Sequence, residues 1–229
     1  MISKQKTCLV VLPSINYTFD NTLNGIKINV LQEIKYYFEK ENIQWKIATY
    51  LGNKPIVNFD NEEKNRNWLK DNISSELISN VLNFDNVTVN NYEGLFIPSF
   101  ISIYEEVKIN DNTLTRLIYQ FHNQNKPICV IGHSVFALCR VVDENNIWPF
   151  ICYNFTGISI FKFMMDSLFN NKYLDIIIEE LVLLQGGNFM SSDSQVDDIV
   201  VVADRNIITG MDHFSNASCL VNLTAKMNM

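Results

Sequence analysis

Along residues 8–142, short runs that are apolar at every position alternate with longer amphipathic segments. The runs 8–12 and 128–131 are typical of strands buried on both faces of a parallel sheet. The segment 25–40 instead spaces its apolar residues three or four positions apart, which predicts a helix with one buried face. The pattern therefore predicts an α/β fold whose parallel strands are joined by right-handed helical crossovers.

The same reading assigns elements along the whole chain. Strands are predicted at 8–12, 44–50, 92–98, 128–131 and 150–153, and as a late hairpin at 199–203 and 206–209. Helices are predicted at 25–40, 65–70, 74–82, 112–125, 133–142, 159–165, 175–184 and 214–226. The pair Gly186-Gly187 is predicted to cap the helix before it. No internal repeat or long linker interrupts the pattern, so residues 1–229 are predicted to form a single domain.

Charge and composition narrow the possible functions. The net charge of −7, with no lysine or arginine cluster, argues against direct nucleic-acid binding. No apolar stretch approaches the roughly twenty residues of a membrane span, so no membrane insertion is expected. The run 8–12 is too short for a secretory signal peptide. Five cysteines in apolar contexts indicate reduced thiols in a cytoplasmic protein.

The strongest candidate for a functional site is the corner that follows the run 128–131. Gly132, His133 and Ser134 interrupt the strand before an apolar helical pattern begins. Enzymes use such strand-turn-helix corners to expose a nucleophile beside helix-terminal amides. Here the corner residue is glycine, which has no side chain to attack with. The corner is therefore predicted to be a vestigial elbow without a catalytic residue.

This pattern, with its corner after the fourth core strand, resembles the class I glutamine amidotransferase-like superfamily, which includes PfpI proteases and the Parkinson-disease protein 7 deglycases. The resemblance runs through most of the chain and includes W-L-K-D around Trp68, F-I-P-S around Pro98, and G-H-S-V-F-A-L-C from Gly132. It implies a flavodoxin-like three-layer α/β sandwich, with a mainly parallel sheet and helices on both faces. It also places Gly132 at the nucleophile cysteine and His133 at the adjacent histidine.

Two further departures from the superfamily pattern favour a pseudoenzyme. Active relatives place a glutamate soon after the first strand. Here the only carboxylate in residues 13–32 is Asp20, which lies too far from the end of that strand. Relatives often carry a glycine pair after the third strand, whereas residues 97–100 contain none. The resemblance also implies a homo-oligomer and membership in a larger assembly, an early-endosome Rab-effector complex. RNA contact by this acidic chain itself is not expected, and neither is a cofactor.

Two other functions remain open at this point. G-H-S-V-F resembles the G-x-S-x-G elbow of α/β-hydrolases, and Asp204 and His213 follow Ser134 in the hydrolase order. Phe136 occupies the position of the last glycine, which argues against this reading. A residual hydrolase or glyoxalase-type enzyme would use Ser134 or Cys152. A small-ligand sensor would instead use the vacated space beside Gly132.

The remaining histidines and cysteines favour structural roles. His133 is predicted to be a hydrogen-bonded histidine at the strand-helix junction. His122 and His213 are predicted to be surface or loop residues, and no metal-ligand spacing links the three histidines. Cys129 and Cys139 flank the corner in apolar contexts, where burial makes a thiol inert.

Overall fold

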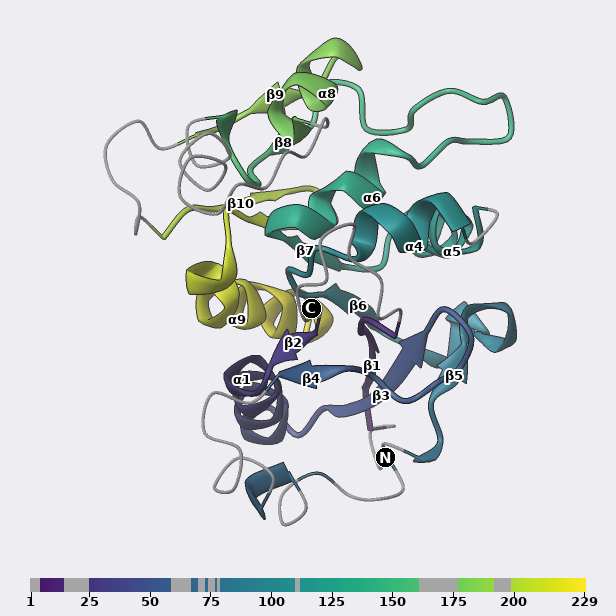
Figure 1. Ribbon diagram of the computed structural model, residues 1–229. Coiled ribbons are helices and arrows are strands. Elements are labelled where there is room, and N and C mark those ends of the chain that lie inside the picture. Colours follow the sequence, from purple (N-terminus) through teal and green to yellow (C-terminus); the bar gives the residue numbers. More distant parts are fainter. Residues whose placement is uncertain are drawn as a thin grey trace.

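The computed structural model describes residues 5–14, 25–58, 67–69, 73, 77, 79–109, 112–160, 177–191 and 199–229. A seven-stranded sheet forms the centre, in the order β10-β11-β7-β6-β1-β3-β5 (Figure 1). Neighbouring strands in this sheet are parallel, apart from the antiparallel β10–β11 hairpin. The predicted flavodoxin-like three-layer sandwich with a late hairpin is therefore confirmed.

Six strands of the main sheet have bounds within two residues of the predicted strands, and the two-residue strands are missing from the prediction. The main sheet contains β1 (Thr7–Val11), β3 (Gln44–Thr49), β5 (Leu82–Asn83), β6 (Gly94–Ile97), β7 (Ile128–Ile131), β10 (Val201–Asp204) and β11 (Ile207–Gly210). Two small parallel pairs join β2 (Ile26–Lys27) to β4 (Val57–Asn58) and β8 (Asn154–Phe155) to β9 (Asn188–Phe189). The strand predicted at 150–153 is wrong. These residues form a turn in which the Tyr153 amide donates to the Phe150 carbonyl at 3.1 Å.

The described helices are α1 (Ile28–Lys40), α4 (Ile103–Ile109), α5 (Thr113–Asn123), α6 (Val135–Cys139), α8 (Ile178–Leu184) and α9 (Asn216–Met227). Four 3₁₀ turns accompany them: η1 (Phe84–Asn86), η2 (Val89–Asn91), η3 (Gly132–Ser134) and η4 (His213–Ser215). Helix α4 is missing from the sequence prediction. The helix predicted at 74–82 is wrong at its end, because Leu82 pairs with β3. Most of the helix predicted at 159–165 lies outside the described residues.

The sheet separates two hydrophobic cores. Leu9 and Val11 of β1 belong to one core, and Cys8 and Val10 belong to the other, because successive side chains leave a strand on opposite faces. Residues of α4, α5 and α6 cover the first face, and residues of α1 and α9 cover the second (Figure 1). This two-sided burial explains why the central strands are apolar at every position.

Helix α8 ends as its glycine pair predicts. Gly186 has a φ of +86°, and its amide donates to the Leu183 carbonyl at 3.1 Å. The Gly187 amide donates to the Val182 carbonyl at 3.0 Å. This pair of bonds is a Schellman cap, so the predicted C-cap is confirmed.

The parallel strands bring four loops to one edge of the sheet. Strands β1, β6, β7 and β11 are neighbours or near neighbours and run in the same direction. The loops that follow them therefore meet at their carboxyl ends, where open α/β sheets form their ligand sites. The corner at Gly132 lies at this edge.

Candidate functional site

The corner after β7 has the backbone of a nucleophile elbow. Strand β7 is buried at all four positions, and Gly132 then turns the chain with a φ of +58°. This left-handed conformation costs a residue with a Cβ roughly 1–2 kcal/mol and costs glycine little. The turn η3 and the helix α6 follow directly. The strand-turn-helix corner is therefore present, with no side chain at its apex.

Ser99, in the loop after β6, fills the space that a side chain on Gly132 would need. A Cβ built on Gly132 would overlap Ser99 Oγ and lie 2.9 Å from Ser99 Cβ. It would also stand 3.5 Å from Asp212 Cα, in the loop after β11, which is an ordinary contact. Ser99 would therefore have to move before any side chain stood at the apex.

The same serine engages the backbone amide of His133. This amide donates to Ser99 Oγ at 3.2 Å. In elbow enzymes, the amide of the residue after the nucleophile supplies one donor of the oxyanion hole. In this protein a side chain of the neighbouring loop already accepts that hydrogen bond.

The imidazole of His133 contacts Tyr104 of α4. His133 Nδ1 lies 3.2 Å from the Tyr104 hydroxyl, and the two rings meet edge to face at 5.9 Å. Burial, and then the nearby Cys139 thiol, raise the pKa of Tyr104 well above its ordinary value. The hydroxyl is therefore protonated at neutral pH and can donate to Nδ1. The structure thus agrees with a hydrogen-bonded histidine at the junction.

Ser134 is fully buried, and its hydroxyl is engaged. Its Oγ donates to the Pro98 carbonyl, at the end of β6, at 2.6 Å. The position of Ser134 at the start of the helix suggests a capping role for its hydroxyl, and the structure shows none. Ser134 has helical backbone angles, φ −69° and ψ −14°, and makes no capping bond. An N-cap residue needs an extended backbone to turn its oxygen toward those amides.

The hydrolase-like trio Ser134, Asp204 and His213 is not brought together. Asp204 ends β10 and pairs with Ile207, the first residue of β11. Ile207 in turn pairs with Ile128, the first residue of β7. Asp204 therefore lies at the amino-terminal edge of β7, and the corner lies at its carboxyl-terminal edge. The Asp204 carboxylate accepts from the backbone and side-chain nitrogens of Asn154 at 2.9 Å. His213 follows β11 on the corner's side, with its ring 4.1 Å from the Phe214 ring.

Cys152 lies at the same opposite edge as Asp204. Its carbonyl accepts from Arg205 Nη2 at 3.2 Å, and Arg205 forms the turn between β10 and β11. The thiol is exposed, and the residue has a φ of +60°. Cys152 therefore lies at the amino-terminal edge of β7, away from Gly132.

The cysteines that flank the corner are buried. Burial, with the adjacent Cys219 thiol, raises the pKa of Cys129 well above its ordinary value. Burial raises the pKa of Cys139 to about 12. The thiolate form is therefore scarce at neutral pH, which confirms the prediction of inert thiols at both positions.

A buried glutamate near the corner escaped the sequence reading. Glu106 of α4 has no exposed surface, and its Oε1 accepts from the Ser14 amide, just after β1, at 3.0 Å. A carboxylate therefore does approach the end of β1, from α4 and not from the loop after β1. In the sequence, this glutamate can be recognised as a charged residue between the apolar residues Ile103, Tyr104 and Val107, which are buried in the structure. Asp20 lies outside the described residues.

His122 is half-buried in the last turn of α5, where the sequence predicts a surface or loop residue. Its Nδ1 lies 3.2 Å from Asn206 Oδ1, and its ring meets the Phe150 and Tyr153 rings edge to face. Burial lowers the pKa of His122, although the Asn206 bond opposes the shift. The contact-rich end of an amphipathic helix therefore accounts for this histidine without a ligand.

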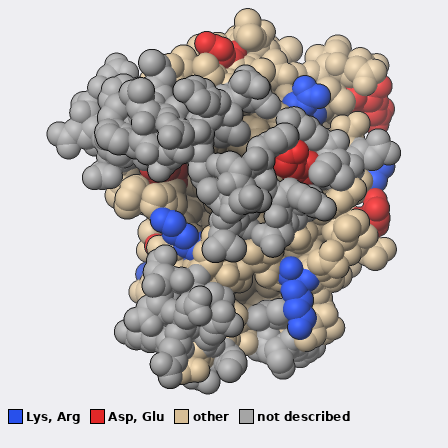
Figure 2. Space-filling view, in the orientation of Figure 1, with Lys and Arg blue, Asp and Glu red and all other residues tan. Residues whose placement is uncertain are grey.

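Neither a metal cluster nor a membrane span is found in the described part of the chain. There, no group of three or more histidine, cysteine, aspartate or glutamate side chains can hold a metal ion. Likewise, none of the described helices is both long and apolar enough to cross a membrane. On the face in Figure 2, described basic and acidic side chains are interspersed.

Comparison with known proteins gives relatives but no matching family model. Glutamine amidotransferase-like class 1 domain-containing protein 1 of Bos taurus is 30% identical over 172 residues, which cover 75% of this chain and 76% of the relative. Rapid Encystment Protein 24 KDa of Francisella tularensis has a TM-score of 0.80 at 18% identity, covering 97% of this chain and 99% of that one. Glyoxalase III of Candida albicans has a TM-score of 0.76 at 14% identity, covering 96% and 97%.

The two solved structures show the fold, since they share the sandwich at low sequence identity. The Bos taurus relative shows the family as well, because its 30% sequence identity extends over about three quarters of both chains. The resemblance read from the corner motif is thereby confirmed. The chain belongs to the family of glutamine amidotransferase-like class 1 domain-containing protein 1.

Proposed function

We propose that this protein is a catalytically silent amidotransferase-like domain, a pseudoenzyme that acts as a scaffold or subunit of a protein complex. One observation carries the proposal. The Ser99 side chain stands where a nucleophile on residue 132 would be, and its hydroxyl accepts the amide hydrogen of His133. An elbow enzyme needs both a nucleophile and a free oxyanion donor at this point.

Two further contacts support the proposal. The Ser134 hydroxyl, the nearest alternative nucleophile, is buried and bonded to the Pro98 carbonyl. His133 Nδ1 contacts the buried Tyr104 hydroxyl. The polar groups of the corner thus stabilise the junction of β6, β7 and α4.

A residual hydrolase or glyoxalase-type enzyme is the alternative, acting through Ser134 or Cys152. Its support is the fold shared with a glyoxalase III and the exposed thiol of Cys152. Activity assays distinguish the two functions. The purified protein is assayed with methylglyoxal and with p-nitrophenyl acetate, beside the variants Ser134→Ala and Cys152→Ser. We expect no turnover above buffer from any of the three. Turnover that either substitution abolishes establishes the enzyme instead.

The scaffold role predicts stable partners. The tagged protein is captured from its own cells and its partners are identified by mass spectrometry. We expect stoichiometric partners that remain after a high-salt wash. Gly132→Trp, checked for folding by its thermal melt, tests whether the corner contributes to the interface. Gly186→Trp is the matched control, because it places the same side chain at another positive-φ glycine. Recovery of a homo-oligomer without partners contradicts the scaffold role.

The family resemblance adds a finer proposal. The protein forms a homo-oligomer within a cytoplasmic assembly, an endosomal Rab-effector complex, and lies peripherally on early endosomes. Membrane fractionation tests this placement: we expect co-sedimentation with early-endosome markers that carbonate washing releases. A protein that stays wholly in the supernatant contradicts it, and light scattering of the purified chain measures the oligomer.

A further inference from the structure

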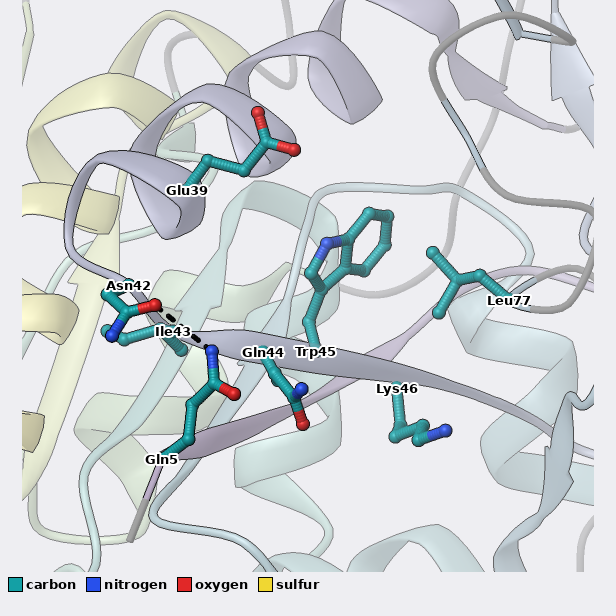
Figure 3. Close-up of a pocket in the computed structure, with 8 residues that line it drawn as sticks. All are labelled: Gln5, Glu39, Asn42, Ile43, Gln44, Trp45, Lys46 and Leu77. Carbon is teal, nitrogen blue, oxygen red and sulfur yellow. Dashed lines mark hydrogen bonds between the residues drawn. The ribbon is translucent and has the colours of Figure 1, made fainter. Parts of the chain in front are cut away.

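Two cavities share Trp45 of β3 as a wall, and neither adjoins the corner. The larger, of about 490 Å³, lies at the amino-terminal end of β3 and is lined mainly by polar side chains (Figure 3). The smaller, of about 300 Å³, lies between α1, β3 and the segment that leads into β4. Strands β6 and β1 separate β3 from β7 in the sheet, so both cavities lie away from Gly132.

Three polar side chains that line the larger cavity already have partners. Gln5 Nε2 donates to Asn42 Oδ1 at 3.1 Å, as the dashed line in Figure 3 shows. Glu39, on the last turns of α1, forms an ion pair with Lys35. Lys46 leaves β3 on the side opposite Trp45 (Figure 3). A ligand here would have to replace bonds that the side chains already make, so this cavity offers little net gain on binding.

The smaller cavity has a different lining. Its walls are apolar side chains from four parts of the chain: Leu31, Trp45, Ile47, Pro55, Val57, Leu69 and Ile73. Lys54 is the one charged residue among the lining residues. Its side chain is exposed, and the described residues provide no salt bridge to it. An apolar chamber with one cation among its lining residues is complementary to an apolar molecule with one anionic group.

The segment that carries Lys54 is fixed by backbone bonds. The Ile56 amide donates to the Pro13 carbonyl, and the Ile26 amide donates to the Ile56 carbonyl, each at 2.9 Å. Thr49 Oγ1 donates to the Asn53 carbonyl at 2.8 Å. These bonds hold the chamber open at the side of the sheet where β1 and β3 end. A preformed chamber lowers the entropy lost on binding.

We propose that this chamber binds a small molecule that has an apolar body and an anionic head group. The body packs against Trp45 and Ile47, and the head group pairs with Lys54. A volume of about 300 Å³ lies at the lower end of the range of small-molecule sites, so the ligand is small. The site needs no nucleophile, so it stands whether or not the corner is catalytically silent.

The test uses three probes of equal chain length and different charge: octanoate, octanol and octylamine. Binding to the whole protein is measured by isothermal titration calorimetry at neutral pH and low salt. For a ligand of about ten heavy atoms that fills such a chamber, we expect a dissociation constant between about 10 µM and 1 mM. A solvent-exposed ion pair adds up to about 1 kcal/mol, so octanoate should bind up to about fivefold tighter than octanol. Octylamine should bind more weakly than octanol.

Three variants locate the site. Lys54→Gln should weaken octanoate to the level of octanol, and Lys46→Gln, a lysine of the other cavity, should leave it unchanged. Val57→Trp fills the chamber and should abolish binding of both probes. If Val57→Trp does not fold, the two lysine variants still test the proposal, because both lysines are exposed and their substitution should not affect folding. Failure of octanoate to reach half-saturation by about 1 mM overturns the proposal, as does an equal effect of the two lysine variants.

Discussion

A side chain at Gly132 should destabilise this protein by more than its positive φ alone accounts for. The left-handed backbone at +58° costs alanine roughly 1–2 kcal/mol. The new Cβ also overlaps Ser99, with a Cβ–Cβ separation of 2.9 Å, and overpacking of this kind costs about 1–3 kcal/mol. Gly132→Ala should therefore lower the free energy of unfolding by roughly 2–5 kcal/mol.

A double-mutant cycle separates the two contributions. Ser99→Gly removes the atoms that the new Cβ would overlap, and by itself it loses one hydrogen bond to the His133 amide. Combined with Gly132→Ala, it should recover the steric part and leave the backbone strain. We therefore expect the double variant to be more stable than the sum of the single effects by about 1–3 kcal/mol.

Urea denaturation followed by circular dichroism measures all four proteins, with an unchanged m value as the check that only stability differs. Gly186→Ala is the matched control. Its φ is +86°, but its Cβ would meet only Ile151 Cγ2 at 3.6 Å, an ordinary contact. It should cost about 1–2 kcal/mol and show no coupling to Ser99→Gly. Strict additivity at Gly132 and Ser99 would falsify the argument that Ser99 fills the apex.

Three further predictions concern other parts of the chain. Burial lowers the pKa of His122 below its ordinary 6.5, so the protein is more stable above that pH and loses this stability as the pH falls below it. Between pH 7.5 and about 5.5, the free energy of unfolding should therefore fall less for His122→Gln than for the wild type. An equal fall contradicts this. Iodoacetamide should label Cys152 alone in the native protein, since the other four cysteines are buried, and mass spectrometry of the digest reads the sites. Lys126→Met removes donors to the Val89 and Tyr92 carbonyls and should lower the free energy of unfolding by about 1–3 kcal/mol in urea denaturation. A change close to zero contradicts this.

Strands buried on both faces were the most predictable part of the fold. β7 carries apolar residues at every position, and its predicted bounds match the structure residue for residue. Helix α4 was missed because Glu106 lies on its buried side and interrupts the apolar period. The 150–153 run was misread because its aromatic residues, Phe150 and Tyr153, pack as a cluster around a turn. The secondary structure of such short segments depends on tertiary contacts, which cannot be read from the local sequence pattern.

The candidate site was predictable in its residue types but not in its contacts. Gly132 and Ser134 could be read from the corner motif, since a strand that breaks into a helix at one glycine has few other meanings. Ser99 and Tyr104 could not, because they reach the corner from other elements, through contacts that span some thirty residues. The order of Ser134 and Asp204 along the chain also did not predict whether the two residues lie close together. The antiparallel β10–β11 hairpin places Asp204 at the opposite edge of the sheet.

The contacts at the corner leave no room for a side chain at residue 132. A glycine at residue 132 leaves room, and Ser99 occupies that room with a hydroxyl that satisfies the His133 amide. Ser134, one residue further, ties the same corner to the Pro98 carbonyl. Two hydrogen bonds of about 1 kcal/mol each thus join the β7 corner to the loop after β6. The amide that would hold an oxyanion in an enzyme here stabilises the fold, so a cysteine placed at residue 132 would meet an occupied site.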